Sequence, residues 1–140
     1  MKATIQWQGN VAFLGTSGSG HEILMDGAPD QGGQNQGARP MEMVLLGLGG
    51  CSAFDVVTIL RKARQDITDC QVTLSAERAD TVPAVFTHIH MHFAVVGNQL
   101  KEAQVARAVS LSADKYCSAS KMLMDGGVQI SHDYSVTSLD

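Results

Sequence analysis

The sequence predicts an α+β fold in a single domain that spans residues 1–140. Segments with strand-like alternation and segments with helical periodicity follow one another in the order β-β-β-α-β-β-α-α-β. Runs of strands and runs of helices are typical of α+β proteins, whereas strict alternation would indicate a parallel sheet. A chain of 140 residues with 44% apolar residues has enough material for one core of ordinary size.

The first 25 residues are expected to form an antiparallel meander of two or three strands. Ala3, Ile5 and Trp7 alternate with polar residues, as in a strand with one buried face. Residues 26–40 contain several glycines and prolines, which interrupt any periodicity, so we expect a loop there. Proline is favoured in the first turn of a helix, and Pro40 therefore predicts where the next helix begins.

A long helix is expected over residues 41–65. Gly47, Gly49 and Gly50 lie inside it, and each costs about 1 kcal/mol relative to alanine in a helix interior. Two explanations remain open. Either another backbone packs closely against the glycines, or the helix breaks near Cys51.

The second half of the chain alternates between strand and helix patterns. The second of its helices is expected to carry Cys117 near its start, and the last strand is expected to contain a bulge at His132-Asp133. The expected elements are strands over 70–77 and 86–96, helices over 101–113 and 116–124, and a final strand that begins at Val128.

Composition argues against several classes of function. The net charge of −4 is unfavourable for nucleic-acid binding. Only 17% of the residues are charged, so we expect part of the surface to be covered, most simply by a second copy of the chain. No signal peptide and no membrane span are expected, because glycines and Asp55 interrupt the most apolar stretch, Met43–Leu60. The expected location is the cytoplasm.

Three cysteines in such a protein point to free thiols, a metal site or redox chemistry. Cys51 and Cys117 lie in helical segments and are candidates for a redox pair, although each can equally be a small buried apolar residue. The predicted start of the long helix is more than two turns from Cys51, which is too far to stabilise a thiolate. A cation would be required, and Arg39 and Arg78 are the candidates.

A second candidate site is the strand pattern His88-x-His90-x-His92. Strand alternation places the three imidazoles on one face, where they form either the polar face of a half-buried sheet or a zinc site. The polar face is the simpler interpretation, because no clear fourth ligand is present. Asp55 is an acidic residue near Cys51 that could be a ligand or a surface residue. We expect no metal and no organic cofactor.

The cysteine segments resemble two motifs of the OsmC/Ohr family, most closely its YhfA-like branch. The resemblance covers nearly the whole chain, and the hairpin pattern between the motifs also matches. The matching segments are Pro40-Met41-Glu42-Met43, Gly47-Leu48-Gly49-Gly50-Cys51-Ser52-Ala53 and Asp55-Val56-Val57 for the first motif, Glu77-Arg78, Pro83, Phe86-Thr87-His88-Ile89 and Gly97 for the hairpin, and Lys115-Tyr116-Cys117-Ser118 for the second motif.

The resemblance implies an intertwined homodimer in which antiparallel sheets wrap around long central helices and each site forms at the subunit interface. It also implies a thiol peroxidase active in oxidative or osmotic stress. Cys51 would attack a small organic hydroperoxide, Cys117 would resolve the sulfenic acid as a disulfide, and a dithiol reductant would restore the thiols.

The resemblance further implies a glutamate–arginine pair that positions the peroxide. Family peroxidases have the glutamate directly after the proline and the arginine on an N-terminal strand. Here Met41 follows Pro40, Glu42 comes one position later, and Arg39 is the first arginine in the chain. Glu42 and Arg39 are the candidates for this pair. The alternative function is a non-catalytic dimeric binder of a small molecule, or a redox sensor, with the same fold.

Overall fold

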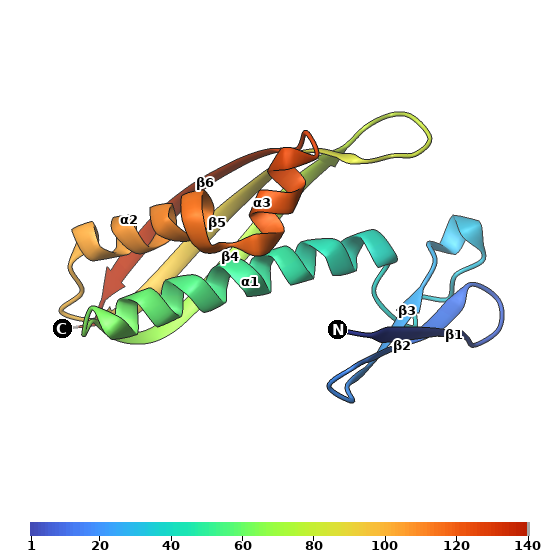
Figure 1. Ribbon diagram of the computed structural model, residues 1–140, viewed down its shortest axis with the longest axis horizontal. Coiled ribbons are helices and arrows are strands. Elements are labelled where there is room, and N and C mark those ends of the chain that lie inside the picture. The colour runs from blue at the N-terminus through green and yellow to red at the C-terminus, as the bar shows by residue number, and fades with distance from the viewer. Residues whose placement is uncertain (140) are drawn as a thin grey trace. The chain divides into compact units, whose positions relative to one another are not determined.

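A computed structural model of the protein describes residues 1–139. Backbone contacts divide the chain into two compact units, Met1–Leu46 and the residues from Gly47 onward (Figure 1). The observed elements confirm the predicted α+β class. That residues 1–140 form one domain stays a prediction. Residue 140 lies outside the described part of the chain.

The N-terminal unit is built on the predicted antiparallel meander. Ile5, Gly15 and Ile23 lie opposite one another across the three strands, so they share one face of the sheet. Ile5 is 57% exposed and Trp7, on the same face, is 61% exposed, so this apolar face has little cover in the described residues. The strands are β1 (Ala3–Trp7), β2 (Ala12–Ser17) and β3 (Glu22–Asp26).

The loop that follows β3 is organised around the buried carboxylate of Asp26. Its oxygens accept the backbone N–H groups of Gly27 at 2.8 Å, Gln34 at 2.9 Å and Gln36 at 3.2 Å. These bonds, with that from Gln34 foremost, hold the pKa of Asp26 below its ordinary value of 3.8. The predicted loop is therefore present, with a short 3-10 turn at Pro29–Gln31.

Helix α1 (Pro40–Lys62) begins at the predicted proline and continues without a break through the glycines. Leu48, Ser52, Val56 and Leu60 recur every fourth residue and are all buried, so one stripe of the helix faces the core of the second unit. Burial of each of the three aliphatic side chains contributes about 1.5–3 kcal/mol. The helix ends three residues before the predicted position.

The backbone conformation at Arg64 explains where α1 ends. Arg64 takes a left-handed conformation, with φ of 57°, and the N–H groups of Arg64 and Gln65 bond back to the carbonyls of Arg61 and Leu60. This is the Schellman arrangement that commonly closes helices. It is unusual here only in using arginine where glycine is preferred, which removes the usual sequence signal for a helix end.

Only one of the three helix glycines faces a neighbour in the protomer. A Cβ at Gly49 would lie 2.8 Å from Leu74 Cδ1, so glycine permits close packing of α1 on the sheet. Among the described residues, a Cβ at Gly47 or Gly50 would meet nothing within 4 Å. The neighbour at Gly49 is a side chain and not the expected backbone, and the alternative of a helix break is wrong.

The second unit is a three-stranded sheet in the order β4-β5-β6. Strands β4 and β5 are antiparallel, but β5 and β6 are parallel, so the expectation of antiparallel sheets holds for only one of these two pairs. The expected bulge at His132-Asp133 is also wrong, since the β5–β6 register is uniform. The strands are β4 (Asp66–Arg78), β5 (Phe86–Asn98) and β6 (Gln129–Ser138).

One face of this sheet is covered by helices. Ile89, Met91 and Phe93 of β5 point to that face and are at most 1% exposed. Helices α2 (Glu102–Leu111) and α3 (Ser118–Asp125) cross the sheet next to β6 (Figure 1). A π-helical turn, Ser112–Tyr116, joins them, and this turn shortens both helices relative to the prediction.

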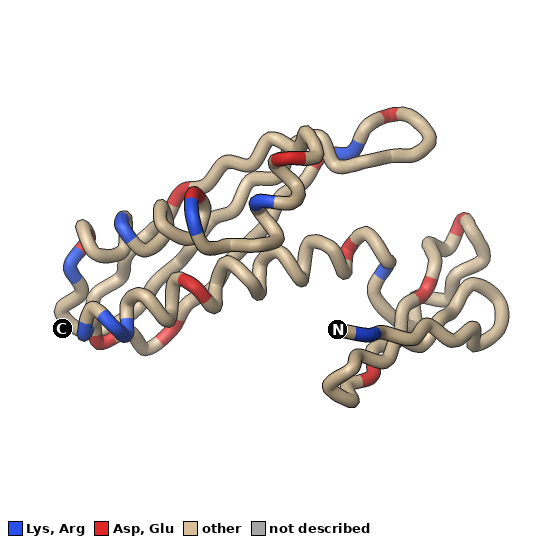
Figure 2. The backbone as a smooth tube through the Cα atoms, in the orientation of Figure 1, with Lys and Arg blue, Asp and Glu red and all other residues tan. Residues whose placement is uncertain are grey.

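Helix α1 is long and apolar enough to cross a membrane by length and composition alone, with a mean hydropathy of 2.0 in its most apolar window. The glycines and Asp55, which were expected to exclude a membrane span, do not keep the helix from meeting these criteria. Only 28% of that window is buried in the protomer, and no charged residue lies between Glu42 and Asp55 (Figure 2). One such helix is weak evidence for a membrane, since core helices of soluble proteins meet the same test.

Replacement of Asp26 tests the organisation of the N-terminal loop. Asp26→Asn removes one of the two carboxylate oxygens, so Tm at pH 7 should fall. A depressed carboxyl pKa stabilises the fold above the ordinary value of 3.8 and loses that contribution as the pH falls through the lower, folded pKa. The Tm difference should therefore shrink below about pH 4. Thermal melts followed by circular dichroism measure both effects. Asp30→Asn, in the same loop, is the control; equal Tm loss in both variants would contradict the role given to Asp26.

Candidate functional site

The site lies in the second unit, where α1 crosses the start of α3. Cys51 and Ser52 are consecutive residues of α1. Ser52 belongs to the buried stripe, and Cys51 is half-buried at its edge. Cys117 precedes α3 and is only 3% exposed. The fold thus brings together two thiols from distant parts of the sequence, with one of them more accessible than the other.

The π-helical turn determines where Cys117 points. After Tyr116 the backbone becomes extended, with φ of −76° and ψ of 104° at Cys117, which places this residue at the N-cap of α3. Its sulfur accepts the Ser120 N–H at 3.4 Å and lies 3.1 Å from Ser52 Oγ. π-Helical turns often occur at functional sites because they redirect the side chains that follow. Cys117 was expected just inside the helix; it caps the helix instead.

The first turn of α3 supplies backbone donors to both sulfurs. The N–H groups of Ser118 and Ala119 act to lower the pKa of the Cys51 thiol, while that of Ser120 hydrogen bonds to the Cys117 sulfur. Free N–H groups at a helix N-terminus favour negative charge. The N-terminus of α1, the helix that carries Cys51, is more than two turns from this residue and too distant to act on its thiol. The donor is a different helix, and sequence reasoning missed it because the contact is tertiary.

The two thiols are coupled by a hydrogen bond between their side chains. The Ala119 N–H acts to lower the pKa of Cys51, but burial and the neighbouring Cys117 sulfur outweigh it, so the pKa of Cys51 is raised. Burial acts to raise the pKa of Cys117, yet the Ser120 and Ser52 hydroxyls, the Ser120 N–H and the Cys51 thiol together lower it. The two thiols therefore titrate as a pair, with the pKa of Cys117 lowered and that of Cys51 raised.

Buried hydroxyl groups surround the pair. Ser112 Oγ donates to Asp55 Oδ2 at 3.1 Å and lies 3.3 Å from the Ser52 carbonyl oxygen, so it ties the π-helical turn to α1. The Ser120 hydroxyl is buried near Cys117 and forms no hydrogen bond of standard geometry with the described residues. Asp55, one turn after Cys51, therefore contacts the second-cysteine segment; among the described residues it is not part of a metal-binding group.

The other candidate residues have their own local partners. Arg39 Nη1 donates to Asn35 Oδ1 at 2.9 Å and to the Gly37 carbonyl at 3.2 Å, and the Arg39 N–H donates to Glu42 Oε1 at 2.7 Å. Both residues thus help to begin α1 in the N-terminal unit. Their role at the thiols stays a prediction.

The alternative cation and the third thiol lie on β4. Arg78 Nε donates to the Ala84 carbonyl at 2.8 Å in the β4–β5 hairpin. Cys70 is half-buried, and burial, with a smaller contribution from Asp69, raises the pKa of its thiol. Neither of the other two thiols is among the causes of this shift, so Cys70 provides a control for the pair.

The three histidines share the outer face of β5, as strand alternation predicts. Ser131 contacts His88 and His90 at 3.1 and 2.7 Å, and Asp133 contacts His90 and His92 at 2.9 and 2.8 Å. Among residues 1–139 no group of three or more such side chains is arranged to hold a metal ion. The arrangement is that of a hydrogen-bonded polar sheet face.

Because the two thiols interact, replacement of Cys117 should change the pKa of Cys51. In Cys117→Ser the N-cap acceptor is retained, but the sulfur that raises the pKa of Cys51 is gone, so the pKa of Cys51 should fall below its wild-type value. The pH dependence of Cys51 alkylation by iodoacetamide, read by peptide mass spectrometry, measures this. Cys70→Ser should leave the Cys51 profile unchanged. An unchanged or higher midpoint in Cys117→Ser would argue against the coupling.

Comparison with known proteins identifies the family to which this chain belongs. Residues 33–133 match the family model described as OsmC-like protein. The chain is 53% identical to Protein YhfA of Escherichia coli K12 over 136 residues, covering 97% of this chain and 98% of that protein. A crystal structure of a hypothetical protein from Aquifex aeolicus is 27% identical, with a TM-score of 0.86 over 99% and 97% of the two chains. The organic hydroperoxide resistance protein OhrB of Bacillus subtilis is 18% identical and shares the fold, with a TM-score of 0.62 over 96% of each chain. The chain therefore belongs to the family of OsmC-like proteins.

Proposed function

We propose that the protein reduces organic hydroperoxides with its thiols, with Cys51 as the attacking and Cys117 as the resolving cysteine. The observation that carries the proposal is the pair of coupled thiols at the N-terminus of α3. Membership of the OsmC-like family and the shared fold with a hydroperoxide resistance protein support it. The reaction needs no metal or organic cofactor, and we propose that it takes place in the cytoplasm.

Accessibility assigns the two roles. Cys51 is half-buried and can be reached by a peroxide, whereas Cys117 is 3% exposed. The Cys51 thiolate attacks the distal oxygen, the O–O bond breaks, and the products are the Cys51 sulfenic acid and an alkoxide. The alkoxide takes a proton and leaves as the alcohol.

Cys117 acts in two steps. Before attack, it holds the one proton that the two sulfurs share, which leaves Cys51 as the thiolate nucleophile. After attack, it returns that proton to the alkoxide and becomes a thiolate. This thiolate attacks the Cys51 sulfenic sulfur, a disulfide forms, and hydroxide leaves to become water on protonation. An external dithiol then reduces the disulfide by thiol–disulfide exchange, and its own two thiols are oxidised.

Arg39 and Glu42 are proposed to position and polarise the peroxide. In their unit the Arg39 guanidinium and the Glu42 carboxylate lie beside the first turn of α1, where Glu42 accepts the Arg39 N–H. Guanidinium groups donate several hydrogen bonds in a fixed geometry, which suits them to hold the two oxygens of a peroxide.

The protein is also proposed to act as an intertwined homodimer. Gly47, Gly50 and Phe54 lie on one face of α1 by helical spacing; nothing lies within 4 Å of a Cβ at either glycine, and Phe54 is 71% exposed. The apolar face of the N-terminal sheet, with Ile5 and Trp7, is also exposed. A second copy that covers these surfaces accounts for a long apolar helix in a soluble protein.

The peroxidase proposal is tested with cumene hydroperoxide and a dithiol such as dihydrolipoamide. Cys51→Ser should reduce peroxide consumption to the uncatalysed rate, because the nucleophile is lost. Cys117→Ser should leave a sulfenic acid on Cys51 that dimedone traps, since no resolving thiol remains. Cys70→Ser is the matched control and should retain the wild-type rate. If the wild-type protein consumes no peroxide and forms no sulfenic acid, the binder or redox-sensor alternative takes its place.

The dimer is tested at Phe54. The wild-type protein should have a mass in solution of two 14.9 kDa chains. Phe54→Asp places a charge in the proposed interface and should weaken dimerisation about a hundredfold, so that dilute samples approach the mass of one chain. Phe54→Leu keeps an apolar side chain and should remain dimeric. Light scattering after size exclusion gives these masses; a monomeric wild-type protein, or a dimeric Phe54→Asp, would exclude this interface.

A further inference from the structure

Three of the four buried polar residues in the described chain are serines near the sulfur of Cys117. Ser52 and Ser120 adjoin the sulfur itself, and Ser112 ties the turn before it to α1. A buried hydroxyl loses its hydrogen bonds to water, so it is unfavourable in a core unless it gains another partner. Such a cluster around one sulfur indicates that the hydroxyls act on that sulfur.

Helix α1 places the Ser52 hydroxyl against this sulfur. Ser52 Oγ lies 3.1 Å from Cys117 Sγ, and the Ser52 carbonyl oxygen lies 3.3 Å from Ser112 Oγ. Ser112 Oγ also donates to Asp55, which fixes the turn before Cys117 against α1. While Cys117 is a thiol, either group can donate in its contact with Ser52. A thiolate can only accept, so the Ser52 hydroxyl donates to it.

The Ser120 hydroxyl adjoins the same sulfur but forms no hydrogen bond of standard geometry with the described residues. The backbone N–H of Ser120 already donates to Cys117 Sγ at 3.4 Å. A thiol sulfur is a weak acceptor, whereas an ionised acceptor forms hydrogen bonds that are roughly twice as strong as neutral ones. The Ser120 hydroxyl therefore gains a strong partner only when Cys117 is a thiolate.

The serine hydroxyls favour negative charge on Cys117 rather than on Cys51. Burial acts to raise the pKa of Cys117, but the Ser120 and Ser52 hydroxyls help to lower it. This preference gives no advantage in the attack on a peroxide, in which Cys51 is the nucleophile. It gives an advantage where Cys117 departs from a disulfide, because a more stable thiolate leaves faster.

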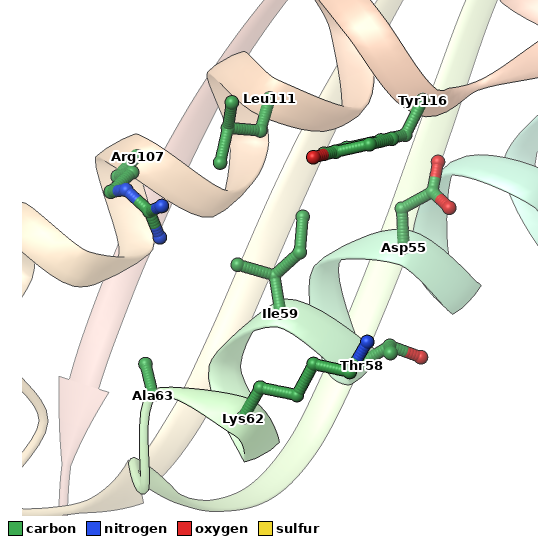
Figure 3. Close-up of a pocket in the computed structure, with 8 residues that line it drawn as sticks. All are labelled: Asp55, Thr58, Ile59, Lys62, Ala63, Arg107, Leu111 and Tyr116. Atoms are coloured by element: carbon green, nitrogen blue, oxygen red, sulfur yellow. The ribbon is translucent and has the colours of Figure 1, made fainter.

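Access to the two sulfurs favours the same direction of disulfide cleavage. Cys51 is half-buried, whereas Cys117 is 3% exposed. A cavity of about 570 Å³ lies between α1 and α2, and Asp55 and Tyr116 are among the residues that line it (Figure 3). Cys117 is not part of this lining, so the cavity gives no access to its sulfur. A reductant therefore reaches the Cys51 sulfur more readily, which makes Cys117 the leaving group.

We propose that Ser52 and Ser120 are positioning residues that hold Cys117 as the leaving thiolate when an external dithiol reduces the disulfide. A thiolate of the dithiol attacks the Cys51 sulfur, the bond between the two protein sulfurs breaks, and its electron pair leaves on Cys117. The second thiol of the reductant gives its proton to Cys117 and attacks the reductant sulfur in the mixed disulfide. This step releases the Cys51 thiolate and the cyclic, oxidised reductant. The inference rests on the proposed function, which supplies the disulfide and the dithiol.

Reduction of a chemically formed disulfide tests the role of the two hydroxyls. Diamide forms the disulfide without peroxide, and its reduction by excess dihydrolipoamide is followed by N-ethylmaleimide quenching and mass spectrometry. Ser52→Ala and Ser120→Ala should each slow reduction about fivefold, because the departing sulfur loses a charge-assisted hydrogen bond while its charge develops. Ser118→Ala, which changes an exposed serine of the same helical turn, should keep the wild-type rate. An unchanged or faster rate in both buried variants would overturn the proposal.

Thermal stability separates this role from a purely structural one. Ser120→Ala removes a buried hydroxyl that has no good partner, so the reduced protein at pH 5 should keep its Tm or gain in Tm. A residue that serves packing alone would show the opposite pattern, because looser packing lowers Tm and exposes the disulfide. A lower Tm together with faster reduction would therefore assign Ser120 to packing and overturn its proposed role.

The sulfur that the reductant attacks is mapped with 2-mercaptoethanol, which has no second thiol to complete the reaction. After brief treatment of the diamide-oxidised protein and an acid quench, peptide mass spectrometry should find the adduct on Cys51 and a free thiol at Cys117. An adduct on Cys117, or no disulfide between the two cysteines after diamide, would contradict the proposal. If the protein consumes no peroxide but the adduct and the serine effects are as expected, the peroxidase proposal falls and this one stands.

Discussion

The hydrogen bonds from the first turn of α3 to two sulfurs are the constraint on which the site depends. A helix N-terminus has free N–H groups, and here those of Ser118, Ala119 and Ser120 are directed to Cys51 and Cys117. No arginine or lysine is among the causes of the pKa shifts of the two thiols. Backbone donors and hydroxyl groups lower the pKa of Cys117, whereas the pKa of Cys51 stays raised, so the cation that sequence reasoning required at Cys51 has no counterpart among these causes.

Packing within the second unit places the N-terminus of α3 next to the two thiols. The buried stripe of α1 and the covered face of the sheet fix the position of Cys51. The π-helical turn then ends α2 early and turns the chain, so that Cys117 caps α3 rather than lying within it. Ser112 ties this turn to α1 through Asp55. The same turn places Tyr116 in the neighbouring cavity, and so the cavity and the thiol pair share one structural cause.

Two apolar surfaces, one on α1 and one on the N-terminal sheet, are exposed in the described chain. A long apolar helix with uncovered glycines and Phe54, and a small sheet with an uncovered apolar face, are costly in water. The homodimer proposed above would cover both, and it would also account for the low content of charged residues, 17% of the chain.

The sequence by itself determined the elements that local pattern controls. Strand alternation placed the meander and the histidine face, Pro40 placed the start of α1, and the cysteine motifs indicated the family. Positions that depend on local signals were therefore accurate to a few residues. The left-handed Arg64 that ends α1 lacks the glycine signal, and so the predicted end was too late.

Only the tertiary structure decided which groups act on the thiols. The α3 donors lie far from Cys51 in the chain, and so does Cys117 itself. The parallel pairing of β6 with β5 is also a long-range choice. Such contacts depend on how buried faces pack against one another, and no spacing within a segment encodes them. The sequence could name the two cysteines, but the backbone donors and hydroxyl groups around them are brought there by packing.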